Sequence, residues 1–172
     1  MSSITFEKSV VARMFDEAIE FCAEKSGFNG TERAHKAIGN GDCCVCEYLR
    51  YALARQVAEY LGSVDESITA IYTYEPDYAT GPDSMGPGHP RVQPAMNLIA
   101  RVNRKSAALS SVAVSLSAAM AEELRRLGCP HANALCRELA VHVADEQEVK
   151  KRMGYGALID SLYVRPIEVW HR

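Results

Sequence analysis

The sequence predicts an α+β fold, with a mostly antiparallel four-stranded sheet covered on one face by helices and a helical N-terminal third. Apolar residues recur every three or four positions in the first 62 residues and again between residues 106 and 127. In two shorter segments, residues 96–103 and 139–143, they alternate with polar residues instead, which is typical of strands with one buried face. Residues 67–75 are β-branched and aromatic, which also favours a strand. No linker composition divides the chain, so we expect residues 1–172 to form a single domain.

Three helices are expected in the N-terminal third. The first covers residues 5–25, and its apolar stripe contains Val11, Met14, Phe15, Ala18, Ile19 and Cys22. A short helix follows over residues 31–38. The third begins after Asp42, a preferred N-cap residue, and is expected to end at Leu61 because Gly62 follows.

The second half is expected to alternate strands and helices. Strands are predicted over residues 67–75, 96–103, 139–143 and 162–170, with helices over 106–127 and 145–152. Ile99 is an apolar exception on the outward side of its strand, and His142 is expected at the surface. If the second face of the sheet is open, aromatic side chains are candidates to line it: Tyr72, Tyr74, Tyr163 and Trp170.

Composition is that of a soluble globular protein, with 48% hydrophobic and 24% charged residues. No apolar run approaches the roughly 18 residues needed to cross a bilayer, and Glu7 and Lys8 interrupt any signal-peptide core. We therefore expect a cytoplasmic protein without membrane contact. The net charge of −3 gives no reason to expect nucleic-acid binding.

Charge is unevenly distributed along the chain. Residues 1–90 have a net charge of −7 and residues 91–172 a net charge of +4. This asymmetry favours a protein partner or self-association into a homo-oligomer, or an anion site in the second half. The simpler interpretation, which we favour, is that two halves of one domain attract each other.

A long loop is predicted over residues 76–94, which contain five of the seven prolines and three glycines. It contains Asp83, Ser84 and His89, but a loop of this composition is a poor support for a catalytic triad. A binding arm and plain surface disorder remain alternative interpretations.

Three of the six cysteines, Cys43, Cys44 and Cys46, lie in the predicted first turn of the third helix. Unpaired amides and the helix dipole favour a thiolate there, and Cys44, on the same face as Arg55, is the expected reactive thiol. A zinc ion or an iron–sulfur cluster would need further ligands, for which the candidates are Cys129, His131 and Cys136. The alternative is that Cys22, Cys46 and Cys136 are small core residues.

Basic residues are concentrated where the second strand leads into the long helix. Arg101, Arg104, Lys105 and Ser106 are candidates for binding phosphate or carboxylate at the helix start. No glycine-rich phosphate loop accompanies them, and a solvated surface is the alternative.

No catalytic motif is present, so whether the chain is an enzyme stays open. The leading hypothesis is a small intracellular binding or assembly protein that engages a partner subunit or a small anionic ligand. The alternative is a thiol-redox or metal-binding protein that uses the cysteine cluster.

Overall fold

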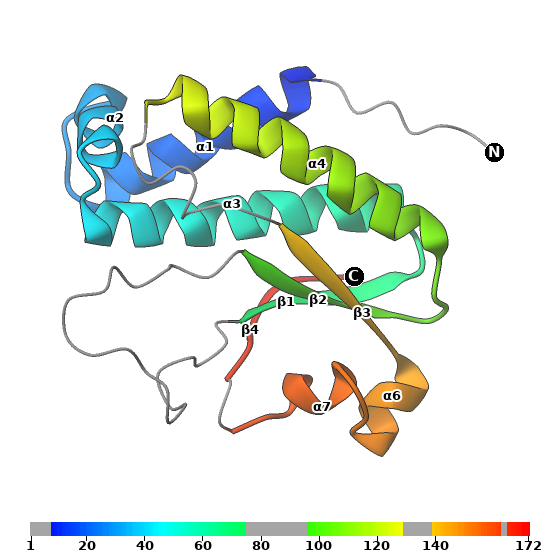
Figure 1. Ribbon diagram of the computed structural model, residues 1–172. Coiled ribbons are helices and arrows are strands. Elements are labelled where there is room, and N and C mark those ends of the chain that lie inside the picture. Colours follow the sequence, from blue (N-terminus) through cyan, green and yellow to red (C-terminus); the bar gives the residue numbers. More distant parts are fainter. Residues whose placement is uncertain (1–7, 75–95, 129–138, 163–164) are drawn as a thin grey trace, which may run out of the picture.

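A computed structural model describes residues 8–74, 96–128, 139–162 and 165–172, and its fold is α+β (Figure 1). In chain order the elements are α1 (Lys8–Lys25), α2 (Thr31–Gly39), α3 (Cys43–Val64), β1 (Ile68–Tyr74), β2 (Asn97–Val102), α4 (Ala107–Arg126), β3 (Ala140–Asp145), α6 (Glu146–Lys151), α7 (Gly156–Ile159) and β4 (Ile167–His171). The predicted order of helices and strands is confirmed, and α7 is an additional short helix.

The four-stranded sheet has the order β3-β2-β1-β4. β1 pairs antiparallel with both β2 and β4, whereas β2 and β3 are parallel. The sheet is therefore mixed, and the prediction of a mostly antiparallel sheet is wrong. The reason is α4, which connects β2 to β3 and returns the chain to the same end of the sheet, as parallel neighbours require.

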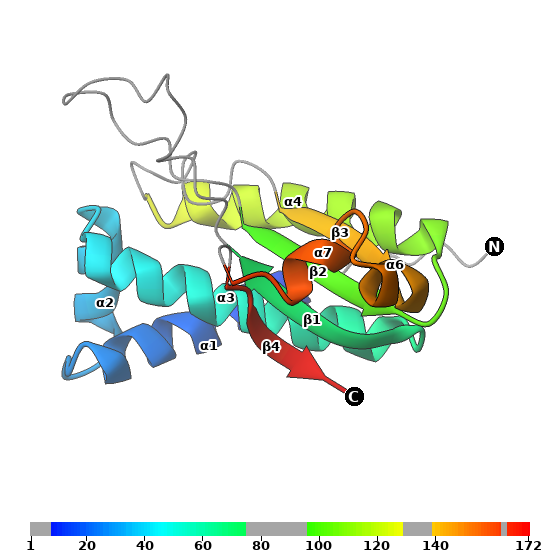
Figure 2. The same ribbon diagram turned by 90° about the horizontal axis from the view of Figure 1, so that it is seen from below.

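The two faces of the sheet are covered differently. Helices α1, α3 and α4 lie over one face, here called the inner face, and α6 and α7 lie on the other, the outer face (Figure 1). Figure 2 shows the two short helices over the part of the sheet formed by β2 and β3. The prediction that helices cover only one face of the sheet is therefore not confirmed.

Each face has its own apolar cluster. The inner one is large and includes Phe15, Leu49, Leu53, Ile71 and Leu98. The outer one consists of Ile99, Ala144 and Val149, with partly buried neighbours Tyr72, Tyr74, Leu158 and Ile159. Burial under α6 and α7 explains why Ile99 is apolar on the outward side of its strand.

Side chains cap the helices where the sequence predicts their starts. Asp42 accepts a hydrogen bond from the Val45 amide at 3.1 Å, so α3 begins at Cys43 as expected. At the start of α6, the Asp145 carboxylate accepts from the Glu148 amide while the Glu148 carboxylate accepts from the Asp145 amide. These local hydrogen bonds explain why helix starts were predictable from sequence.

Gly62 does not end α3, in contrast to the prediction, because the helix continues to Val64. Its lack of a side chain instead admits the indole of Trp170 from β4, since a Cβ there would lie 2.3 Å from the ring. Arg172 lies over the same indole and donates to the Gly62 carbonyl at 2.7 Å. The close approach therefore fixes β4 against α3.

Helix α4 is long and apolar enough to cross a membrane by length and composition alone, which the sequence analysis did not anticipate. Core helices of soluble proteins meet the same criteria. Here Leu109, Leu116, Met120 and Leu124 are buried against the inner-face cluster. One side of α4 is therefore part of the hydrophobic core, while Val114 on another side is 71% exposed.

Candidate functional site on the outer face

An open depression of about 460 Å³ lies on the outer face of the sheet. Thr69 and Ala70 line it together with five larger polar residues, here called the outer-face site: Tyr72, Arg101, Glu146, Glu168 and His171. Strand register explains how residues far apart in sequence meet here. Tyr72 is opposite Glu168, while Ala70 lies between Arg101 on one side and His171 on the other. The small Ala70 side chain leaves the depression between its larger neighbours.

Arg101 and Glu146 form the best-defined ion pair of the site. Nε and Nη2 of Arg101 donate to the two carboxylate oxygens of Glu146 at 2.7 and 2.8 Å. This two-bond geometry fixes the guanidinium plane. The hydrogen bonds to Arg101 hold the pKa of Glu146 below its ordinary value, and those to Glu146 raise the pKa of Arg101. Both groups are therefore charged at neutral pH.

Tyr72 connects this pair to the other side of the depression. Its hydroxyl interacts with the side chains of Arg101 and Glu168, and Glu168 Oε1 lies 3.1 Å from His171 Nδ1. Burial, followed by the charge of Glu168, raises the pKa of Tyr72. Tyr72 therefore stays protonated at neutral pH. Side chains from β1, β2, β4 and α6 form one continuous polar network.

An aromatic group continues the outer face toward β3. The imidazole of His142 stacks on the Tyr155 ring, with centroids 3.9 Å apart and planes 15° from parallel. The Tyr74 ring lies 6.2 Å from the same imidazole. His142 is thus half-buried rather than a plain surface residue, and burial lowers its pKa. Of the four aromatic candidates, Tyr72 and Tyr74 belong to this face, Trp170 packs on α3, and Tyr163 lies outside the described residues.

The predicted anion-binding residues are only partly brought together. Arg101 lines the depression, but Lys105 pairs with Glu148 on α6 at 2.6 Å, which raises the pKa of Lys105. The Ser106 hydroxyl accepts from the Ala108 amide as the N-cap of α4, and Arg104 is exposed. An anion at Arg101 or Lys105 would have to compete with Glu146 or Glu148.

The cysteines of α3 have different surroundings. Cys43 and Cys44 are exposed, whereas Cys46 is buried. Cys22 of α1 is also buried, and burial raises its pKa to about 11. A hydrogen bond with Cys43, and then the charges of Cys43 and Asp42, raise the pKa of Cys44. These neighbours oppose thiolate formation at Cys44, although the helix start is where it was predicted.

Metal binding by the cysteines stays a prediction. Within the described parts of the chain, no three His, Cys, Asp or Glu side chains are grouped to hold a metal ion. Cys129, His131 and Cys136 lie outside those parts, as do Asp83, Ser84 and His89 of the predicted loop.

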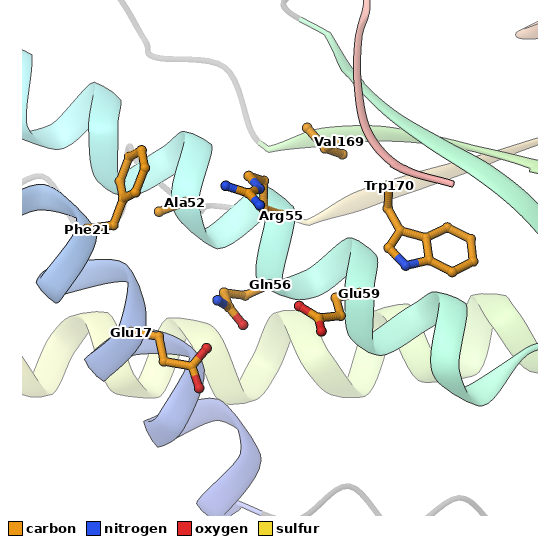
Figure 3. A pocket seen from close by; sticks show the side chains of 8 residues that line it. All are labelled: Glu17, Phe21, Ala52, Arg55, Gln56, Glu59, Val169 and Trp170. Carbon is orange, nitrogen blue, oxygen red and sulfur yellow. The ribbon is translucent and has the colours of Figure 1, made fainter. Parts of the chain in front are cut away.

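A second, smaller hollow of about 150 Å³ lies between α1, α3 and β4. Figure 3 shows Glu17 on α1 and Gln56 and Glu59 on α3 around it, with Trp170 at one end. Arg55 lines this hollow. Glu17 also pairs with Arg13 of its own helix, and Trp170 packs on Gly62, so these two side chains have structural roles. The outer-face site is the stronger candidate because its polar groups contact one another across elements.

Sequence reasoning identified Arg101 and Tyr72 but missed Glu146, Glu168 and His171. The available signal was strand alternation, which directs Tyr72 and Arg101 to the same side of the sheet.

Comparison with known proteins gives no further guidance: no protein-family model matches this chain, and neither a curated protein nor a solved structure shows significant similarity to it.

Proposed function

We propose that this chain is a small-molecule-binding protein and that its ligand occupies the outer-face site. The observation that carries the proposal is the continuous network of Tyr72, Arg101, Glu146, Glu168 and His171 around an open depression of about 460 Å³. The depression is open to solvent, so a ligand can enter it without a change in the fold.

The energetics of the network support a binding role. Pairing charged groups at a half-buried surface adds little stability, and apolar side chains of similar size stabilise a sheet face about as well. Polar groups that hold one another in fixed orientations are, however, what a site needs to recognise a ligand. Binding is favoured over proton-transfer chemistry because the raised pKa of Tyr72 makes it a hydrogen-bonding group and not a base at neutral pH.

An assembly role is the second candidate, favoured by exposed apolar side chains between α6 and the start of β4. Met153, Tyr155, Leu162 and Ile167 are between 39% and 83% exposed, and all come from one short stretch of chain. Clustered exposed apolar residues are common at protein–protein contacts.

A ligand screen with paired variants tests the binding proposal. Wild type, Tyr72→Phe and the control Tyr51→Phe are screened by thermal shift against cationic, anionic and neutral polar compounds. Tyr51 is an exposed tyrosine on α3, so its variant removes the same hydroxyl away from the site. We expect compounds that stabilise wild type and Tyr51→Phe while binding Tyr72→Phe about tenfold more weakly, equivalent to about 1.4 kcal/mol.

Two results would count against this function. Equal stabilisation of all three proteins would place binding elsewhere, and no stabilisation by any compound would remove the proposal. Native mass spectra of the same samples address the second candidate: a dimer that Leu162→Ser abolishes would favour assembly.

A further inference from the structure

We infer that the ligand of the outer-face site carries an organic cation, an ammonium or guanidinium group, that binds Glu168. This inference rests on the proposed function, since it specifies the ligand class for the same site. It follows from how the charges of the site are paired.

The two carboxylates of the site have different partners: Glu146 pairs with an arginine, whereas the nearest basic group to Glu168 is a histidine. Among the described residues that line the depression, Arg101 is the only arginine or lysine, and both of its hydrogen bonds to a carboxylate go to Glu146. Glu168, in contrast, contacts the Tyr72 hydroxyl and the His171 imidazole, which is charged only when protonated. With a neutral imidazole, the site has a net charge of −1 centred on Glu168.

The position of Glu168 suits a cationic ligand. Its side chain is 45% exposed at the edge of the depression, so a ligand reaches it without opening the structure. Tyr72 is its direct cross-strand neighbour, and an aromatic ring beside a carboxylate adds a surface on which the organic part of a ligand can pack. A metal ion is a poorer occupant, because no suitable group of three ligands exists within the described residues.

An anionic ligand meets the opposite situation. It would have to break two hydrogen bonds to free Arg101 from Glu146, and it would enter a depression that is lined by two carboxylates, Glu146 and Glu168. Like-charge contacts of this kind weaken binding. The expected anion site at Arg101 is therefore less favourable in this geometry than a cation site at Glu168.

Three probes of similar shape and different charge test the inference: 2-phenylethylammonium, 2-phenylethanol and 3-phenylpropanoate. Binding is followed by two-dimensional NMR of the ¹⁵N-labelled full chain. We expect the ammonium probe to shift the amide signals of Tyr72 and Glu168 and to bind at least tenfold more tightly than the other two. Binding should weaken as salt is added, since the contact with Glu168 is partly screened by ions.

Matched variants locate the contact. Glu168→Gln keeps an oxygen acceptor for Tyr72 but removes the charge, and we expect it to weaken ammonium binding about tenfold or more. Glu20→Gln removes the same charge from the exposed surface of α1, and should leave binding unchanged.

The outcomes separate the inference from the proposed function. Stronger binding of the alcohol or carboxylate at the same amides, or full binding of the ammonium to Glu168→Gln, would overturn the cation inference while leaving the binding site intact. Absence of ammonium binding would also overturn it. The proposed function itself fails only if the Tyr72→Phe screen shows no ligand at this face.

Discussion

Leu98 and Ile99 are consecutive residues of β2, both fully buried, and they face opposite sides of the sheet. Leu98 contacts the large cluster under α1, α3 and α4, whereas Ile99 belongs to the small cluster next to α6 and α7. The helices over the inner face are 18 to 22 residues long, and those on the outer face have six and four residues. One strand therefore separates two different environments.

Polar groups follow this division. No charged or polar residue is fully buried in the described parts of the chain. Arg101 and Glu146 are half-buried on the outer face, where each remains about one-third exposed. Removing a charge from water is costly unless it is paired and partly solvated, so the thinly covered face is the one that can hold a polar site. The inner face therefore contributes most of the stability, and the outer face is the one that we propose to bind a ligand.

The largest expected effect compares the two faces directly. Leu98→Ala should lower the free energy of unfolding by about 3–5 kcal/mol, and Ile99→Ala by about 2–3 kcal/mol, both within the usual range for such truncations. The inner-face cavity is held open by long packed helices, whereas the short helices over Ile99 can move into the space. Urea denaturation measures both values, and equal losses would contradict the division between the faces.

A second pair of variants tests how β4 is held on the inner face. Gly62→Ala places a methyl group against the Trp170 indole and should cost about 1–3 kcal/mol, because α3 or β4 must shift. Gly39→Ala at the end of α2 meets no atom within 4 Å and should be neutral or stabilise by up to about 1 kcal/mol. Thermal unfolding of the two proteins provides the comparison. If Gly62→Ala is as stable as wild type, the contact between Gly62 and Trp170 does not fix β4.

The smallest expected effect belongs to the outer face. Glu146→Gln removes the partner of Arg101 and should lower stability at neutral pH by about 1 kcal/mol, since the pair is partly exposed. The folded-state pKa of Glu146 lies below its unfolded value, so this contribution is present above the unfolded pKa and is lost as pH falls through the folded one. Unfolding at pH 7 and at successively lower pH should therefore show wild type and variant converging in acid. A constant difference at all pH values would contradict the ion-pair explanation.

Local features of the sequence were sufficient for most individual elements. Asp42 and Asp145 cap helices through hydrogen bonds to residues two or three positions away, so their effect is visible in a short window of sequence. Alternation likewise identified β2 and the outward direction of Arg101. Gly62 was misinterpreted because its neighbour, Trp170, is more than one hundred residues away in the chain.

By itself, the sequence determined the α+β class, the order of the main helices and strands, and the helix start at Cys43, because each depends on periodicity or on a side chain bonding to nearby backbone. Only the tertiary structure decided that β2 and β3 are parallel, that α6 and α7 cover Ile99, and that Tyr72 is next to Glu168. Those features depend on which strands become neighbours and in what register. Contacts between distant segments determine both, and no local pattern records them.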